Sequence, residues 1–270
     1  MRTSLTTGAN SGIGLATVLE LARRGFRSVG TVRSAAKAEV VANAAHEAGV
    51  TVETSLLDVT DADDCARVVD EYRPDALVNN AGYSIAGAIE DVSDEEALAA
   101  LQTMVLAPTR LARLAVPHMR DRGGGRVVNL ASIYGRMSVP LTGWYLGAKH
   151  ALEGVSDALR MEVARDGIRV ILIEPGGFRT GIWEESEHEI TKRGGSRYDA
   201  SYRRALTTIR LWQPLMGDPL RCAHVIGAAL TTKWPRPRYL VGHDAQALAI
   251  WNSLTPTEVK DRIVRFAMGL

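Results

Sequence analysis

The sequence predicts one α/β domain, residues 1–270, built on a doubly wound parallel sheet of Rossmann type. Three observations predict it: strand and helix patterns alternate along the chain, most strands are apolar, and glycine or asparagine clusters follow several of them. Alternating units with apolar strands are typical of a parallel sheet that helices cover on both faces. The length of 270 residues suits one large domain better than two.

The first predicted strand covers residues 3–6 and holds threonine, serine and one leucine rather than a strongly apolar run. A helix is expected after the following glycine turn, because Leu15, Val18, Leu19 and Ala22 repeat at the spacing of a buried helical face. The rest of the first half is predicted as strands over 27–32, 51–57 and 75–78 and helices over 35–48 and 61–72. Thr60 or Asp61 is expected to cap the last of these helices.

The second half continues the alternation. One long helix is expected over residues 94–120, with a kink at Pro108 because proline has no N–H to donate. The other elements are predicted as strands over 126–130, 168–173 and 239–241 and helices over 144–166, 219–231, 244–252 and 257–268. Residues 180–217 show no clean periodicity and are expected to be irregular.

A glycine-rich turn, Thr7 to Gly14 (TGANSGIG), lies between the first predicted strand and helix. Strand, glycine turn and helix form the context that a phosphate-binding loop requires. Glycines let the backbone approach a pyrophosphate, and the helix start supplies free N–H groups and the positive end of the helix dipole. The candidate phosphate-contacting residues are Gly8, Asn10, Ser11, Gly12, Ile13 and Gly14.

Tyr145 and Lys149 lie four residues apart, on one face of a predicted helix, and Ser132 lies thirteen residues upstream of the tyrosine. A free tyrosine has a pKa near ~10, and an adjacent ammonium lowers it by favouring the phenolate. We therefore expect Tyr145 to act as an acid and base near neutral pH, with Ser132 holding a substrate oxygen.

Composition excludes several classes of protein. The formal net charge of +1 gives no reason to expect nucleic-acid binding. Cys65 and Cys222 imply no disulfide framework, so a reducing, cytoplasmic environment is expected, with no room for a signal peptide before the first strand. No apolar run approaches the ~18 residues of a membrane span. The acidic run over 184–189 lacks metal-ligand spacing, so a solvated helix face is expected there and no metal.

With these motifs in hand, the chain resembles the short-chain dehydrogenase/reductase family, in its single-domain subclass. The matching motifs are the glycine turn, Asn79-Asn80-Ala81-Gly82, the Ser132/Tyr145/Lys149 set and Pro175-Gly176 followed by Thr180. The resemblance covers roughly residues 3–180, and two further stretches, 144–162 and 237–242, look most like the 17β-hydroxysteroid and retinol dehydrogenase branch.

The resemblance implies a role for each matched residue. Tyr145 would exchange the proton of the substrate oxygen, Lys149 would lower the tyrosine pKa and bind the nicotinamide ribose, and Ser132 would position the substrate. Residues expected along the adenine and ribose are Asp58, Val59, Asn80, Ala81 and Gly82. Those expected to hold the nicotinamide carboxamide are Pro175, Gly176, Phe178 and Thr180.

One residue typical of the family is missing. Most members carry an asparagine on the long central helix, where this chain has Met104, and a thioether cannot replace an amide in a hydrogen-bond relay. Either the relay runs through backbone and water with activity retained, or the enzyme is slow or specialised. Thr103 or Gln102 could substitute only if the helix register differs by one or two residues.

The cofactor is predicted to be NADP(H) rather than NAD(H). Enzymes that use NAD place an acidic residue at the end of the second strand, about 20 residues past the glycine loop. This chain has Val32 and Arg33 there, and an arginine suits a 2′-phosphate. The alternative is that Arg33 is a solvated loop charge.

The substrate is predicted to be a small apolar ketone or secondary alcohol, because aromatic residues could wall a hydrophobic pocket. The resemblance implies that the segment over 180–217 forms a lid over the substrate. The candidates are Ser84, Trp144, Trp183 and Trp212, with Ile85, Tyr198, Tyr202, Leu211, Leu215 and Met216 around them. The alternative is that half of these are ordinary core or oligomer contacts. A homodimer or homotetramer through the central helices is expected from the family.

Two other functions are compatible with some of these motifs. A non-catalytic NADP(H)-binding or sensing protein would keep the fold, and Met104 gives it slight support against the intact Ser132, Tyr145 and Lys149. A nucleotide-sugar epimerase or dehydratase shares the tyrosine and lysine, but usually has a differently spaced glycine loop and a larger C-terminal domain.

Overall fold

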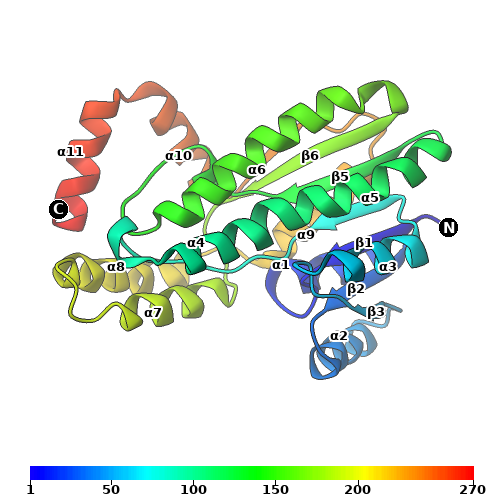
Figure 1. The fold of residues 1–270 in the computed structure, drawn as a ribbon, viewed down its shortest axis with the longest axis horizontal. Helices are drawn as coiled ribbons and strands as arrows, with labels where there is room; N and C mark the ends of the chain where they lie inside the picture. Colours follow the sequence, from blue (N-terminus) through cyan, green and yellow to red (C-terminus); the bar gives the residue numbers. More distant parts are fainter.

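A computed structural model describes residues 1–270 and has one seven-stranded sheet in the order β3-β2-β1-β4-β5-β6-β7 (Figure 1). Every adjacent pair of strands is parallel, as predicted. The strands are β1 (Thr3–Thr7), β2 (Arg27–Val32), β3 (Glu53–Leu56), β4 (Ala76–Asn79), β5 (Gly125–Leu130), β6 (Ile168–Pro175) and β7 (Arg238–Val241). The strand order reverses between β1 and β4, where ligands bind in sheets of this kind.

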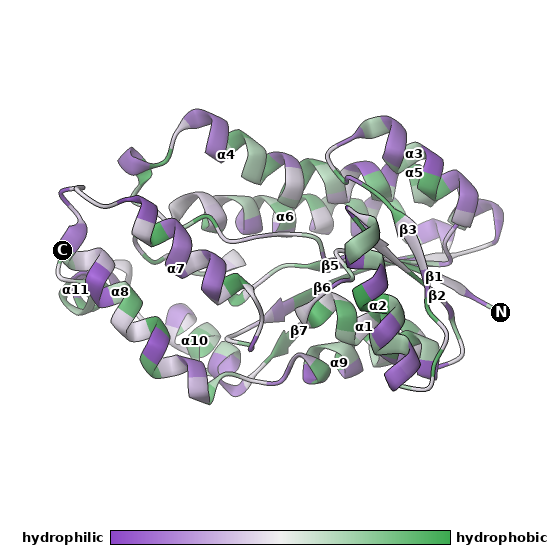
Figure 2. Ribbon diagram, turned by 90° about the horizontal axis from the view of Figure 1, so that it is seen from below, coloured by the Kyte–Doolittle hydropathy of each residue, from purple (hydrophilic) through white to green (hydrophobic).

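Helices cover both faces of the sheet, and Figure 2 shows these layers edge-on, with α4 to α6 on one side and α1 and α9 on the other. One layer consists of α1 (Gly12–Arg23), α2 (Ala35–Glu47) and α9 (Pro219–Thr231). The opposite layer consists of α3 (Ala62–Tyr72), α4 (Asp94–Leu101), α5 (Ala107–Asp121) and α6 (Gly143–Glu162). Two large apolar clusters fill the space between the sheet and these layers.

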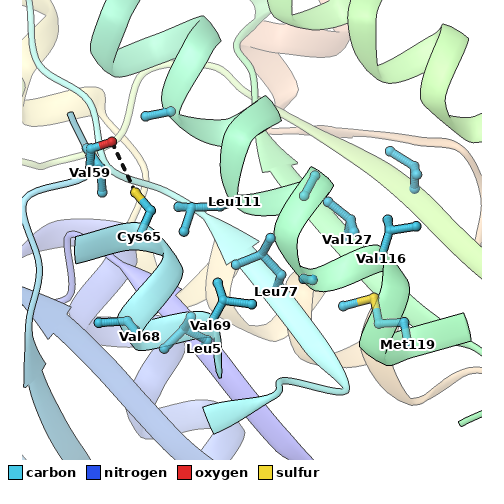
Figure 3. Close-up of a cluster of buried hydrophobic side chains, with 14 of the residues drawn as sticks. Leu5, Val59, Cys65, Val68, Val69, Leu77, Leu111, Val116, Met119 and Val127 are labelled. Carbon is cyan, nitrogen blue, oxygen red and sulfur yellow. Dashed lines mark hydrogen bonds between the residues drawn. The ribbon is translucent and has the colours of Figure 1, made fainter. Parts of the chain in front are cut away.

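The cluster under α3 and α5 is drawn in Figure 3, where Leu5 and Leu77 of the sheet meet Leu111 of α5. Cys65 lies at its edge and donates its thiol hydrogen to the Val59 carbonyl oxygen at 3.4 Å. Burial raises the pKa of the Cys65 thiol, so this side chain packs as a small apolar group. Cys65 and Cys222 are both buried and free.

The long central helix departs from the prediction at one place. A π-helical turn, Gln102–Leu106, joins α4 to α5, and the Ala107 N–H bonds to the Gln102 carbonyl oxygen instead of the usual partner one residue later. Pro108 has no N–H for the Met104 carbonyl oxygen, which favours such a turn. The irregularity therefore lies on the N-terminal side of Pro108 rather than at it.

The lid segment is helical, so the expectation of an irregular 180–217 is wrong. It contains α7 (Ile182–Lys192) and α8 (Asp199–Trp212). Each helix buries only two residues, one of which is a serine, and α8 packs an apolar face that includes Tyr202, Leu206 and Ile209 at helical spacing. The chain ends with α10 (His243–Leu254) and α11 (Thr257–Met268), and none of the helices is both long and apolar enough to cross a bilayer.

Candidate functional site

The glycine turn is held tightly at the carboxyl end of β1. Gly8 and Gly12 have positive φ angles of +66° and +52°, which glycine adopts without strain. A Cβ on Gly14 would lie 2.2 Å from the Gly8 carbonyl oxygen, so only glycine lets α1 start this close to the turn. The first turn of α1 holds no acidic residue, and the Ser11 hydroxyl makes no capping bond. This positive, uncapped helix end fits the phosphates of a dinucleotide.

Thr7 and Asn80 tie the glycine turn to the end of β4. The Thr7 hydroxyl oxygen accepts hydrogen bonds from the N–H groups of Asn80 at 3.0 Å and Ala81 at 2.9 Å. In return, the Asn80 amide donates to the carbonyl oxygens of Thr7 at 2.9 Å and Gly8 at 3.1 Å. The Asn80 side chain therefore fixes the backbone of the glycine turn through its hydrogen bonds to Thr7 and Gly8. Thr7 was not predicted as a site residue, although it begins the motif.

The end of β6 closes the opposite side of the crevice. A Cβ on Gly12 would lie 2.9 Å from the Thr180 side chain, so the segment after β6 comes down onto the glycine turn. Asp244 of α10 locks this segment, because its carboxylate accepts a hydrogen bond from the Gly177 N–H at 2.5 Å. A Cβ on Gly176 would lie 2.1 Å from the Asp244 Oδ2 atom, so the carboxylate occupies the space that a larger residue would need. Pro175 ends β6 itself.

One predicted residue of this segment, Phe178, does not present its side chain to the crevice, and a residue outside the prediction, Asp244, supports the segment. The Phe178 side chain is buried in the apolar core under α9. Only its backbone could therefore contact the carboxamide of a nicotinamide. No motif in the sequence pointed to Asp244, because its contact with Gly177 spans 67 residues.

The structure brings Ser132, Tyr145 and Lys149 together, as predicted. Tyr145 and Lys149 lie one turn apart on α6, with the Lys149 Nζ atom 5.6 Å from the centre of the Tyr145 ring. Lys149 is buried and donates to the Leu130 carbonyl oxygen at 2.7 Å. Ser132 starts the short 3-10 turn η3 (Ile133–Gly135), and its hydroxyl oxygen accepts from the Tyr134 N–H at 3.1 Å.

The expected lowering of the Tyr145 pKa by Lys149 is wrong for this structure. Burial raises the pKa of Tyr145 to about 12, and the hydrogen bond with Ser132 only partly opposes that rise. Burial also lowers the pKa of Lys149 to about 8, against the attraction of the nearby Glu153 carboxylate. At neutral pH the phenol is therefore a proton donor, and the lysine remains mostly charged.

Met104 occupies the position predicted for it. Its side chain is buried and packs against the turn after β4. The packing is close, since a Cβ placed on Gly82 would lie 3.6 Å from Met104 Cγ. Ile85, Ala148 and Tyr145 pack in the same apolar cluster. Gln102 points to solvent, so a shifted register that would place an amide there is excluded.

Arg33 lies at the adenosine end of the crevice, where β2 ends. Its side chain is exposed, and Val32 before it is buried. Hydrogen bonds from Thr60 hold the pKa of Asp58 below its usual value, and the Arg33 guanidinium adds to that effect. Val59 is buried beside Asp58. The first turn of α2 holds no acidic residue, and the Ser34 side chain caps it by accepting from the Lys37 N–H.

The four predicted substrate residues separate into three groups. Ser84 is buried and tied to α7, with its hydroxyl 2.6 Å from that of Ser186 and its N–H donating to Glu185 at 3.2 Å. Trp144 packs beside Tyr145, and Trp183 lies over Gly177 while donating to the Phe178 carbonyl oxygen at 2.8 Å.

Trp212 does not wall an apolar pocket in this structure. It lies at the C-terminal end of α8 with 57% of its side chain exposed, and Leu211 and Leu215 beside it are exposed at 70% and 74%. Of the other lid residues, Tyr202 and Met216 are buried.

The acidic run is part of α7, and two of its four carboxylates, those of Glu187 and Glu189, pair with basic side chains. Glu187 lies 3.1 Å from Arg210, and Glu189 lies 2.6 Å from Lys192. No three histidine, cysteine, aspartate or glutamate side chains anywhere in the chain are placed to hold a metal ion.

Comparison with known proteins identifies the family. The model of the short chain dehydrogenase family matches residues 2–191. The chain belongs to the short-chain dehydrogenase/reductase family. An uncharacterized oxidoreductase, YusZ of Bacillus subtilis, is 33% identical to this short-chain dehydrogenase over 97% of the chain and 96% of its own length. Retinol dehydrogenase 7 of Rattus norvegicus is 30% identical over 96% of the chain and 86% of its own length.

A solved structure agrees with the same assignment. L-sorbose reductase from Gluconobacter frateurii, in complex with NADPH and L-sorbose, is 30% identical to this short-chain dehydrogenase and superposes with a TM-score of 0.76. The match covers 89% of the chain and 94% of the reductase. The protein is thus an oxidoreductase by family, with the parallel sheet typical of these enzymes and a resemblance to retinol dehydrogenases.

Proposed function

We propose that this protein is an NADP(H)-dependent oxidoreductase that interconverts a carbonyl and a secondary alcohol on a small apolar molecule. The observation that carries the proposal is the placement of Tyr145, Lys149 and Ser132 beside a glycine turn built for phosphates. A bound nicotinamide would supply the hydride for reduction or accept it in oxidation.

The protein's own residues handle the proton. Ser132 holds the substrate oxygen, and Tyr145 donates its phenolic proton to that oxygen as the carbonyl is reduced. Its raised pKa keeps this proton in place at neutral pH until charge develops on the substrate. Lys149 then stabilises the phenolate, since its ammonium lies next to the tyrosine ring and its own pKa of about 8 leaves it largely charged at pH 7.

The preference for NADP(H) rests on the corner formed by Arg33 and the start of α2. Arg33 is exposed, with Asp58 as the nearby carboxylate whose pKa it lowers, and Val32 offers no acidic group to a ribose. A 2′-phosphate would gain a planar charge-assisted contact there. The NADPH complex of the similar sorbose reductase supports this choice.

The proposal of an apolar substrate rests on the side chains beside the tyrosine. Trp144 and Ile85 lie on one side, and Trp183 lies over the end of β6. The similarity to retinol dehydrogenases points the same way. L-sorbose reductase shows that a sugar is the alternative class to test.

The proposal is tested by replacing the phenolic hydroxyl. NADPH oxidation by wild type and Tyr145→Phe is followed with a panel of apolar ketones and with L-sorbose. We expect kcat to fall about 10²–10⁴-fold in Tyr145→Phe, because the acid is lost while the ring still packs. Calorimetry should find NADPH binding in both proteins. Equal turnover by the two would disprove the mechanism, whereas binding without turnover in either would favour the non-catalytic alternative.

A further inference from the structure

Asp244, near the start of α10, places its carboxylate on the segment over 176–180, which follows β6. The carboxylate accepts a hydrogen bond from the Gly177 N–H at 2.5 Å, and this is the only hydrogen bond to it. A Cβ on Gly242 would lie 2.3 Å from its Oδ1 atom, and one on Gly176 would lie 2.1 Å from its Oδ2 atom. Glycines after β6 and β7 thus leave room for this one side chain.

Two N–H groups of the segment over 176–180 are left without a partner in the protein. Hydrogen bonds within the chain use three of its five N–H groups, those of Gly176, Gly177 and Arg179. The N–H groups of Phe178 and Thr180 make no such bond. A carboxamide has a carbonyl oxygen that can accept from them. Thr180 also lies against the glycine turn, since a Cβ on Gly12 would lie 2.9 Å from its side chain, so these donors fit the nicotinamide end of a dinucleotide.

The same helix packs on the turn that carries Ser132. Ala245, next to Asp244, is fully buried in an apolar cluster with Ile133 of η3. Near the other end of α10, the Asn252 amide donates to the Arg136 carbonyl oxygen at 2.8 Å. One helix therefore contacts both the segment expected to hold the nicotinamide and the turn expected to hold the substrate oxygen.

We propose that Asp244 is a positioning residue for hydride transfer, which holds the segment over 176–180 so that its unpartnered N–H groups meet the nicotinamide carboxamide. Through α10, the same contact fixes this segment relative to Ser132. The proposal rests on the proposed function, because it concerns the ring that would carry the hydride. The phosphate end is held separately, since Thr7 and Asn80 fix the glycine turn through their own hydrogen bonds.

The backbone of this segment needs such a contact. Gly176 and Gly177 are consecutive glycines, which restrict the chain less than any other residue. A hydrogen bond from a backbone N–H to a carboxylate is charge-assisted and stronger than one to a neutral acceptor. Misplacing a reacting group by about 1 Å can cost about 100-fold in rate. A residue that touches neither cofactor nor substrate can therefore control hydride transfer from this position.

One test compares two nucleotides and requires no turnover. Calorimetry measures the Kd of NADPH and that of 2′-phospho-ADP-ribose, which lacks the nicotinamide ring. We expect wild type to bind NADPH more tightly, and this advantage to shrink about 3- to 10-fold in Asp244→Ala, the value of one hydrogen bond. The Kd of 2′-phospho-ADP-ribose should not change. An equal advantage in both proteins, or none in wild type, would overturn the proposal.

Three further variants show whether the hydrogen bond is the cause. Asp244→Asn keeps an oxygen that can accept from Gly177, so it should recover most of the advantage. Asp244→Leu has a similar volume without an acceptor, so it should match Asp244→Ala, and it replaces that variant should Asp244→Ala fail to fold. Asp261→Ala on α11 removes an exposed carboxylate and should change neither Kd. If Asp244→Asn lost the advantage as fully as Asp244→Leu, the proposal would fail.

The second test separates positioning from a merely structural role. In Asp244→Ala we expect kcat with an apolar ketone to fall about 10- to 100-fold, while the unfolding temperature stays near that of wild type. Hydrogen exchange of the Gly177 N–H, followed by NMR without nucleotide, should be faster in Asp244→Ala and slow again in Asp244→Asn. A fall in kcat without faster exchange at Gly177 would overturn the proposal.

Tyr145→Phe is measured in the same assays, so that the two proposals can fail separately. Loss of turnover in Tyr145→Phe with a fully active Asp244→Ala would remove only the positioning role. Full turnover in Tyr145→Phe, or a wild type that binds neither nucleotide, would remove the proposed function itself.

Discussion

At the scale of single residues, Arg33 is the side chain with the greatest influence on nucleotide choice. It is exposed at the end of β2, next to the first turn of α2, which holds no acidic residue. The double variant Val32→Asp, Arg33→Ser would remove the partner of a 2′-phosphate and add a carboxylate for ribose hydroxyls. We expect the ratio of kcat/KM for NADPH over NADH to fall about 10- to 100-fold, the value of one or two charge-assisted hydrogen bonds.

The matched control for this prediction is Arg23→Ser at the far end of α1, which removes one positive charge away from the nucleotide. That change should leave the ratio as it is. A double variant that keeps the wild-type preference would contradict the assignment of Arg33 and move the search for the phosphate site elsewhere along the crevice.

Residues that act through local sequence were predictable, and those that act through distant contacts were not. The glycine turn and the Tyr145–Lys149 pair follow from spacing along one element, and the structure places them as predicted. Asp244 could not be found in this way, because its role depends on the meeting of α10 with the end of β6. The Tyr145 pKa also depends on burial, which the spacing does not report.

At the scale of elements, polar contacts fix the lid. Arg193, after α7, donates to the Asp91 carbonyl oxygen at 2.8 Å and pairs with Glu96 at 2.8 Å. Tyr202 of α8 accepts from the Ala88 N–H at 2.8 Å and donates to Asp91 at 2.6 Å. Apolar packing adds to these polar contacts, because Tyr202, Leu206 and Ile209 of α8 lie at helical spacing and pack with Ala86 and Ala88. The apolar face of α8 could therefore have been found in the sequence, whereas its polar contacts with a segment about a hundred residues away could not.

The lid helices give a prediction on stability. Tyr202→Phe keeps the ring but leaves the buried Ala88 N–H without its partner, so the free energy of unfolding should fall by about 1–3 kcal/mol. The loosened lid should also raise KM for the substrate while NADPH affinity stays unchanged. Urea denaturation and steady-state kinetics measure the two effects.

Tyr198→Phe serves as the comparison, because the Tyr198 hydroxyl donates to Glu90 at the surface. Its loss should change neither quantity measurably. If the two variants had equal effects, the contact between Tyr202 and the segment over 84–96 would not be what holds the lid.

At the scale of the whole molecule, the strand order explains why the site residues meet. The sheet reverses between β1 and β4, and the glycine turn, the turn after β4, Ser132 and the segment after β6 all follow carboxyl ends of strands. Parallel strands bring these ends to one edge. The alternation of strands and helices was enough to predict this arrangement, even though β1 is rich in threonine and serine.

The same architecture leaves an apolar outer face on the central helices. Leu98 of α4 is 60% exposed, Leu106 of the π turn 51% and Met161 of α6 69%. These helices rest on the large core under α3 and α5, so they offer a rigid platform for a second copy. We propose that the protein forms a homodimer or homotetramer through this face. A two-fold axis would place the same patch on both partners.

Leu106→Glu tests this assembly, because each two-fold interface would receive two carboxylates in an apolar setting. We expect the mass measured by light scattering after size exclusion to fall by half or more, with helix content unchanged by circular dichroism. Phe266→Glu on α11 is the matched control, since Phe266 is 86% exposed and lies on the C-terminal helix rather than on the central ones. It should leave the mass unaltered. Dissociation by Phe266→Glu with an intact Leu106→Glu oligomer would place the interface on the C-terminal helices instead (Figure 1).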